Sequence, residues 1–157
     1  MLVLLILCIF LGLSYPQCAL AQEQEALSLH FSVAEWAYEV RDAGDYDPNL
    51  SGQFRRGERG YAYLEIEGFG VGQKDGFFYL QLDVDVALET KSKLRLFSQK
   101  DVLALEEWYF EPPASTWFYI FVDIPWWAPK GIYRTVITVR DAVSETTLEE
   151  VREIMVN

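Results

Sequence analysis

The stretch Gly131-Ile132-Tyr133-Arg134-Thr135-Val136-Ile137-Thr138-Val139-Arg140-Asp141 decides the fold that the sequence predicts. It is rich in Val, Ile, Thr and Tyr, and β-branched and aromatic side chains suit a pleated, half-buried surface. Successive side chains of a strand point to opposite faces, so Tyr133, Ile137 and Val139 share one apolar face. The other face holds Arg134, Thr138 and Arg140. The stretch therefore predicts a β-strand with one face in a hydrophobic core.

The N-terminus has the pattern of a secretory leader. Residues 1–13 form an uncharged apolar run that has signal-peptide length and is too short to cross a bilayer. Ala19-Leu20-Ala21 offers small residues to a signal peptidase. We therefore expect a signal peptide at 1–21, a single mature domain at 22–157 and a secreted or periplasmic location. An uncleaved N-terminal anchor and lipidation of Cys18 are the two alternatives.

The predicted mature domain is acidic and contains no cysteine. Cys8 and Cys18 both lie in the leader, so disulfides cannot cross-link the mature chain. The protein carries 13 Lys and Arg against 24 Asp and Glu, a formal net charge of -11, and every charged side chain follows the leader. Such a surface repels nucleic acid and anionic headgroups. We expect no nucleic-acid partner, and a membrane contact only through an uncleaved leader.

The mature chain has the pattern of short strands separated by turns. Strands are predicted at residues 27–40, 61–69, 77–88, 93–98, 102–110, 116–124, 131–141 and 145–156. The apolar phase slips between Val33 and Ala34, which predicts a β-bulge or a change of sheet. Residues 41–60 and 68–76 are expected to be loops. The last segment also fits a helix, but the hairpin-like residues 141–144 before it favour a strand. The pattern predicts an all-β sandwich.

Two groups of residues resemble bacterial secreted proteins made of one immunoglobulin-like sandwich. They are Phe54-x-x-Gly57-Glu58 with Tyr63-x-Glu65, and Gly131-x-Tyr133 with Val139-x-Asp141. The resemblance covers residues 53–156 and implies an immunoglobulin-like antiparallel β-sandwich of about seven to nine strands. It implies no catalytic residue. The final hairpin of such domains usually carries a glycine, whereas this chain has Ser144-Glu145.

Catalytic patterns are weak in this sequence. His30 is the one histidine, it lies among core positions of the first strand, and no Gly-x-Ser-x-Gly elbow occurs. A glycosidase needs only two carboxylates, and two pairs are available: Asp83 with Asp85, and Glu106 with Glu107. The first pair alternates with apolar residues, as a solvated sheet face does. We therefore expect a non-enzymatic protein without a cofactor.

A calcium loop and a glycosylation sequon are suggested by short patterns. Asp45-x-Asp47-x-Asn49 has the ligand spacing of a calcium loop, but Leu50 and Arg56 stand where the loop needs glycine and glutamate. We interpret this segment as a turn without a metal. Asn49-Leu50-Ser51 is a sequon by pattern.

Aromatic side chains provide the candidate site. If Phe118, Ile120 and Val122 face the core, then the alternating residues Trp117, Tyr119 and Phe121 face outward. Phe77 and Tyr79 face outward by the same argument, and Trp126 and Trp127 lie in the next loop. An exposed aromatic patch is typical of a partner surface or a ligand platform. Alternatively, the rings form cross-strand pairs or are covered by residues 41–60, and the tryptophans close one end of the sandwich.

These observations predict a non-enzymatic, secreted or periplasmic immunoglobulin-like module that mediates protein interaction. The expected partner is another envelope or extracellular protein. The alternative is a carbohydrate-binding module, because tryptophan and tyrosine faces stack on sugar rings. The residues expected to bind are the same in both cases: Trp117, Tyr119, Phe121, Trp126 and Trp127.

Overall fold

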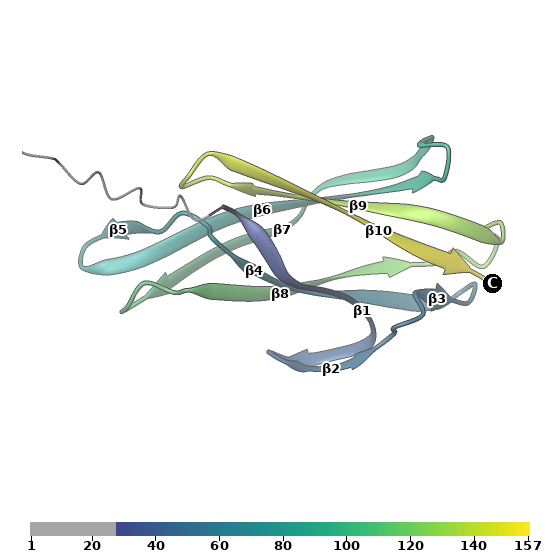
Figure 1. Cartoon of the computed structure of the whole chain (residues 1–157), viewed down its shortest axis with the longest axis horizontal. Helices are drawn as coiled ribbons and strands as arrows, with labels where there is room; N and C mark the ends of the chain where they lie inside the picture. Colours follow the sequence, from purple (N-terminus) through teal and green to yellow (C-terminus); the bar gives the residue numbers. More distant parts are fainter. Residues whose placement is uncertain (1–27) are drawn as a thin grey trace, which may run out of the picture.

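Two β-sheets face each other in the computed structural model, which describes residues 28–157 (Figure 1). Seven strands of nine or more residues and three short strands make up this part of the chain. It contains no helix that could cross a membrane. The predicted leader and its cleavage site lie outside the described residues.

The strands divide into a smaller and a larger sheet. Sheet A has the order β2 (Asp45–Pro48), β1 (His30–Asp42), β4 (Arg59–Glu67) and β8 (Ser115–Asp123). Sheet B has the order β3 (Gln53–Phe54), β10 (Thr146–Val156), β9 (Gly131–Asp141), β6 (Phe77–Thr90) and β5 (Gly72–Lys74), and β7 (Arg95–Tyr109) also pairs with β6. Neighbouring strands are antiparallel except for β3 and β10, which are parallel.

The strand predicted to organise the fold, β9, lies between β10 and β6. Val139 pairs with Leu148 on one side and with Val84 on the other. Tyr133, Ile137 and Val139 are buried, as their shared apolar face predicted. The final segment is the strand β10, so the helical alternative for residues 145–156 is excluded.

The strand order is that of an immunoglobulin domain. If β1, β4 and β8 are strands A, B and E, and β6, β7, β9 and β10 are strands C, C′, F and G, the sheets are ABE and GFCC′. Tyr133 near the start of β9 donates a hydrogen bond from its hydroxyl to the carbonyl oxygen of Pro129 at 2.7 Å. This is the tyrosine corner of the fold. The predicted immunoglobulin-like β-sandwich is confirmed.

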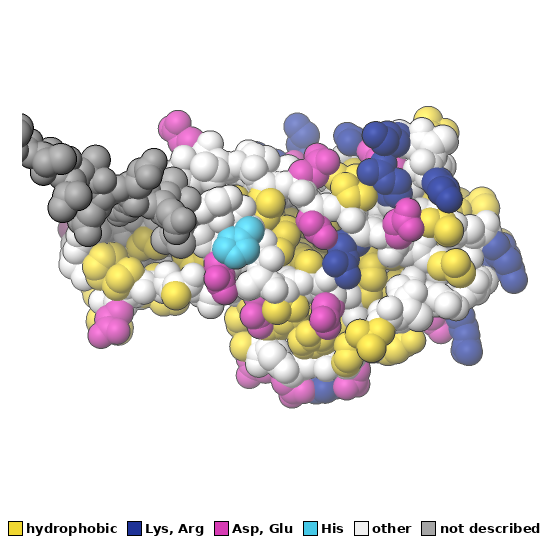
Figure 2. Space-filling model, viewed as in Figure 1, with side chains coloured by type: hydrophobic (Ala, Val, Ile, Leu, Met, Phe, Trp, Pro, Cys, Tyr) yellow, Lys and Arg dark blue, Asp and Glu magenta, His cyan; other side chains and the backbone are white. Residues whose placement is uncertain are grey.

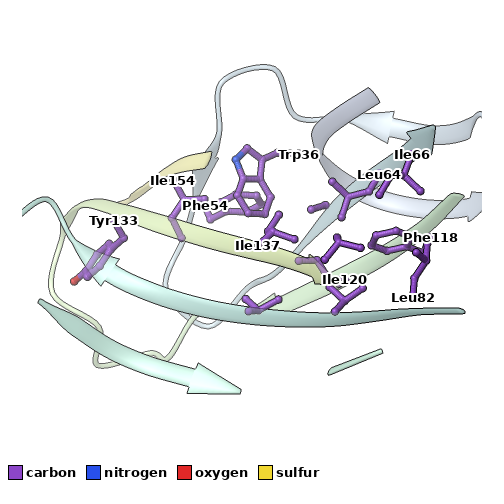
Figure 3. Packing of buried hydrophobic residues seen from close by; sticks show 14 of the residues in the cluster. Trp36, Phe54, Leu64, Ile66, Leu82, Phe118, Ile120, Tyr133, Ile137 and Ile154 are labelled. Atoms are coloured by element: carbon purple, nitrogen blue, oxygen red, sulfur yellow. The ribbon is translucent and has the colours of Figure 1, made fainter. Parts of the chain in front are cut away.

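Side chains from both sheets meet in one apolar core, part of which Figure 3 shows. Trp36 on β1 donates its indole N–H to the carbonyl oxygen of Glu153 on β10 at 3.0 Å, which links the two sheets. The Phe54 ring packs edge-on against Trp36 with 5.7 Å between ring centroids. Phe54 belongs to the first motif of the resemblance, so that motif serves the core.

The predicted phase slip in the first strand is a bulge within β1. The pairing of β1 with β4 shifts between Phe31 and Val33, and both Phe31 and Ala34 pack against the core. An extra residue is needed because the side-chain period of a strand is two. β1 therefore keeps its apolar face inward on both sides of the shift.

Three predicted segments were wrong. The expected loop at residues 41–60 contains β2 and β3, and the expected loop at 68–76 contains β5. Asp75 and Gly76 both have positive φ, 51° and 85°, which is the pattern of a two-residue hairpin turn. The separate strands expected at 93–98 and 102–110 are one strand, β7, with register shifts inside it.

Candidate functional site: an apolar groove beside exposed aromatic side chains

A cavity of about 800 Å³ lies between β7 and β8, and we call it the β7–β8 groove. Its walls are mainly apolar and come from β6, β7, β8 and the loop after β8. Side chains that line it include Val86, Leu103, Leu105, Ile120 and Val122. This volume falls within the range of about 300–1,000 Å³ that is usual for ligand sites.

The groove exists because two sheet edges face each other without a strand between them. β8 is an outer strand of sheet A, and β7 pairs only with β6 in sheet B. In immunoglobulin constant domains a strand D lies beside strand E, but within residues 28–157 no strand occupies that place beside β8. Both edges therefore present backbone groups that are free to pair with an added strand.

A buried hydroxyl belongs to one of the residues that line this mainly apolar groove. Thr135 on β9 is fully buried and lines the cavity. Its hydroxyl is the one buried side-chain nitrogen or oxygen of the described residues that has no hydrogen-bond partner. Thr135 stands two residues after Tyr133, where an antibody domain has a cysteine of its disulfide.

The three predicted aromatic residues of β8 lie on the outer face of sheet A, and we call them the outer aromatic row. Tyr119 is 45% exposed and Phe121 is 52% exposed. Trp117 is half-buried because its ring stacks on Tyr63, with 5.8 Å between centroids. The ring of Tyr46 on β2 stacks on the other side of Tyr63 at 4.2 Å. The binding role predicted for this row stays a prediction.

The hairpin of β1 and β2 contacts Tyr63, the residue on which Trp117 stacks. The backbone N–H of Gly44 donates to the Tyr63 hydroxyl at 2.8 Å, and the Tyr46 hydroxyl donates to Glu35 at 2.9 Å. Burial raises the pKa of Tyr46 to about 12, and the hydrogen bond to Glu35 acts in the same direction. Trp117 therefore forms a cross-strand stack with Tyr63 of β4, whereas Tyr119 and Phe121 are exposed.

The predicted tryptophan pair lies in the loop between β8 and β9. Trp126 is 78% exposed and Trp127 is 66% exposed. Trp127 and Phe121 both line the groove, whereas Trp126 does not. The structure therefore brings Trp127 to the groove and leaves Trp126 at the surface beyond it.

A second aromatic cluster lies on the outer face of sheet B. Phe77 packs against Phe110 with 5.3 Å between centroids, and Tyr79 packs against Trp108 at 5.0 Å. The outward direction of Phe77 and Tyr79 was predicted from the alternation of β6. Their partners were missed because the pairing of β6 with β7 joins residues that are far apart in the sequence.

The side chains weighed for chemistry have local structural partners. His30 is exposed, and its Nδ1 lies 2.8 Å from the carbonyl oxygen of Ser28. Arg41 donates hydrogen bonds to Asp45 and Asp47 and lowers the pKa of both carboxyl groups. Residues 28–157 hold no group of three or more His, Cys, Asp or Glu side chains that could hold a metal ion.

The sequon is closed to modification in the folded protein. Asn49 is only 2% exposed, and its side-chain amide donates to the carbonyl oxygen of Gln53 at 2.9 Å. Its carbonyl oxygen accepts a hydrogen bond from Ser51 at 2.7 Å. A glycan on Asn49 requires these contacts to break.

The carboxylate pairs are also engaged. Asp85 binds Arg140, and Glu107 accepts hydrogen bonds from Tyr109 and Thr116. These contacts are typical of carboxylates that pair with neighbouring side chains on a sheet. A glycosidase instead needs two carboxylates that face each other across a cleft.

The sequence matches no protein-family model, and no curated protein sequence resembles it significantly. Solved structures do resemble it. The C-terminal domain of Wzt has a TM-score of 0.52 and 8% identity, over 82% of this chain and 73% of that one. The alkylpurine DNA glycosylase AlkC of Pseudomonas fluorescens, bound to DNA that contains an abasic site analogue, has a TM-score of 0.50 and 11% identity.

The length of the match differs among these structures. The match with AlkC covers 82% of this chain but only 30% of the glycosylase. An immunoglobulin-like protein of Pseudomonas aeruginosa is 10% identical over 84% of this chain and 98% of its own length, with a TM-score of 0.40. At such identities the likeness shows the fold alone.

Proposed function

We propose that this protein is a non-enzymatic, secreted or periplasmic immunoglobulin-like module that binds an extended segment of another envelope or extracellular protein. The observation that supports the proposal is the apolar β7–β8 groove, which lies open between two sheet edges. The exposed rings of Phe121 and Trp127 adjoin it.

The groove has the features that strand addition uses. An extended segment that lies along β8 can pair with its backbone groups, and these hydrogen bonds supply affinity. Every second side chain of that segment then points into the groove, where Leu103, Leu105 and Val122 offer an apolar surface. The expected partner segment therefore alternates apolar and polar residues.

Selection of peptides from a displayed library of random extended peptides tests this proposal. We expect the selected peptides to alternate apolar and polar residues and to slow amide hydrogen exchange in β8. The substitution Val122→Phe fills part of the groove and is expected to weaken their binding about tenfold or more. Val151→Phe makes the same change at an exposed position of β10 and is expected to leave binding unchanged.

The comparison of these two variants decides the outcome. Peptides that bind the native chain and the Val122→Phe variant equally well do not use the groove, and the proposal then fails. Protection of amides in strands other than β7 and β8 contradicts it as well.

Carbohydrate binding is the second candidate, and the exposure of Trp126 and Trp127 favours it. Flat aromatic faces that are open to water stack on sugar rings. Replacement of both tryptophans by alanine is expected to abolish retention on a glycan array without changing the melting temperature. Equal retention of the variant and the native chain excludes this candidate.

A further inference from the structure

The two ends of the sandwich carry opposite charge. Three turns lie at one end: residues 55–58, 91–94 and 124–130. Their position follows from the pairing, because Thr90 lies opposite Tyr133 and Arg59 lies opposite Asp123. Backbone hydrogen bonds of 2.8 Å also join Ile124 to Gly57 and Glu58. We call these three turns the basic end.

The basic end holds five cations and one carboxylate. The cations are Arg55, Arg56, Lys91, Lys93 and Lys130, and the carboxylate is Glu58. All six residues are exposed. The Lys and Arg side chains gather toward the end of the molecule where the C-terminus lies, as comparison of Figure 1 with Figure 2 shows.

The opposite end is acidic. Its turns are residues 68–71, 75–76, 110–114 and 142–145, and all of them belong to the described part of the chain. These turns hold the carboxylates Asp75, Glu111 and Glu145 and no Lys or Arg. The charged side chains are therefore unevenly distributed between the two ends, although the net charge of the protein is -11.

Large apolar side chains protrude from the basic end. Trp126 is 78% exposed, Trp127 is 66% exposed and Leu94 is 64% exposed. Leu94 comes from the turn after β6 and the tryptophans come from the loop after β8, so two separate turns present apolar side chains beside cations. Tryptophan is enriched where protein meets the headgroup layer of a bilayer, and Lys and Arg are attracted to anionic lipids.

We infer that the basic end docks on the surface of a membrane that contains anionic lipid. The tryptophans and Leu94 enter the headgroup layer, and the five cations contact lipid phosphates. A nucleic acid is the less suitable polyanion, because its phosphate surface offers no apolar layer to Leu94. This inference goes beyond the proposed protein binding. The two surfaces meet at Trp127, which also lines the β7–β8 groove, whereas the five cations, Trp126 and Leu94 do not line it.

The overall acidity of the protein does not oppose this docking. β6 has 14 residues and a strand rises about 3.3 Å per residue, so the acidic end lies about 46 Å from the basic end. Charges are screened over about 8 Å at physiological ionic strength. A lipid surface at the basic end therefore meets mainly the local positive charge, contrary to the expectation from net charge alone.

Sedimentation with lipid vesicles tests the inference. The probes are vesicles of phosphatidylcholine alone and vesicles in which a third of the lipid is phosphatidylglycerol, mixed with the exported and processed chain. We expect binding to the anionic vesicles, a blue shift of tryptophan fluorescence, and loss of binding as salt increases. Absence of binding, or equal binding to both vesicles, overturns the inference.

Variants place the binding at the basic end. Lys91→Glu combined with Lys93→Glu is expected to weaken vesicle binding about tenfold or more, and Trp126→Ala is expected to weaken it severalfold. The controls are at or near the acidic end: Lys74→Glu and Phe110→Ala, the latter at a residue that is 85% exposed. Both controls are expected to bind as the native chain does. Equal losses in controls and test variants contradict the inference.

Two further measurements distinguish membrane docking from the proposed protein binding and from binding to nucleic acid. The groove variant Val122→Phe is expected to bind anionic vesicles normally, so failure of the proposed protein binding leaves the membrane result intact. Double-stranded DNA is expected to bind more weakly than the anionic vesicles. Tighter binding to DNA shows that the basic end recognises a different polyanion and overturns the inference.

Discussion

Glu145 is the last residue of the turn between β9 and β10, the hairpin in which the resemblance to immunoglobulin-like domains implies a glycine. Its φ is 57°, in the left-handed region. The turn is held by Asp141, whose carboxylate accepts hydrogen bonds from the backbone N–H groups of Val143 at 2.9 Å and Ser144 at 3.2 Å. Asp141 also accepts a hydrogen bond from the backbone of Gly70, which ties this turn to the loop after β4. The carboxylate therefore maintains a turn whose last residue is unfavourable for a side chain.

The substitution Glu145→Gly is expected to raise the free energy of unfolding by about 0.5–1 kcal/mol. It removes the left-handed penalty of about 1–2 kcal/mol, while the greater entropy of glycine in the unfolded chain offsets part of the gain. Urea denaturation measures the change. Glu149→Gly is the control, because glycine inside β10 is expected to lower stability. A loss of stability in Glu145→Gly disproves the assigned strain.

Ion pairs on the outer face of sheet B hold the irregular strand β7 in place. Asp85 on β6 accepts hydrogen bonds from Arg140 on β9 and from the backbone N–H of Asp101 on β7, the latter at 2.8 Å. Arg140 also donates to the Asp101 carboxylate at 2.7 Å. Asp101 has a φ of 51° and lies at a register shift between β6 and β7. The Asp85 carboxylate therefore joins three strands at the point where β7 is irregular.

Acid is expected to remove the contribution of Asp85 to stability. The hydrogen bond from Arg140 lowers the pKa of this carboxyl below its ordinary 3.8. A carboxylate whose pKa is lower in the folded than in the unfolded chain stabilises the fold above the unfolded pKa, and this effect is lost as pH falls through the folded value. Asp85→Asn should therefore lower stability by about 1–3 kcal/mol at pH 7, and the difference from the native chain should shrink below about pH 4.

Denaturant titrations of both chains at several pH values provide the measurement. Glu149→Gln is the matched control, because it removes an exposed carboxylate of β10. A difference between Asp85→Asn and the native chain that stays constant between pH 7 and pH 2 contradicts the assigned linkage.

Most long strands could be predicted from alternation, because each buries one face on a single core. β9 and β6 are the clearest examples, and the phase slip in β1 was visible as well. β7 could not be predicted as one strand, because Lys100 and Asp101 look like a turn. Asp101 is held at this register shift within β7 by hydrogen bonds with Asp85 and Arg140, which are distant in sequence.

The candidate site was predictable only in part. The alternation of β8 predicted which rings face outward, but the ring on which Trp117 stacks belongs to Tyr63 on another strand, β4. The groove was missed because it depends on which strands form sheet edges, and edges follow from topology rather than from local pattern. The one feature of the sequence that pointed to the groove was the apolar character of both faces of β8.

At the scale of the whole molecule, the described fold is independent of disulfides. Residues 28–157 contain no cysteine, since Cys8 and Cys18 precede them. The melting temperature of residues 28–157 is therefore expected to be the same with and without a reducing agent, as a thermal scan by circular dichroism can show. A shift of the melting temperature on reduction contradicts this expectation.

The separation of the two ends determines how the module stands on a surface. Ser28 lies beside Gly68 at the acidic end, whereas Val156 pairs with Gly131 next to the basic end. A molecule that contacts lipid through its tryptophans therefore has the long axis of the sandwich roughly perpendicular to the membrane. Ser28 then lies on the side away from the bilayer. In this orientation the sandwich separates Ser28 from the bilayer. The β7–β8 groove runs along the strands, so it faces proteins that approach parallel to the membrane.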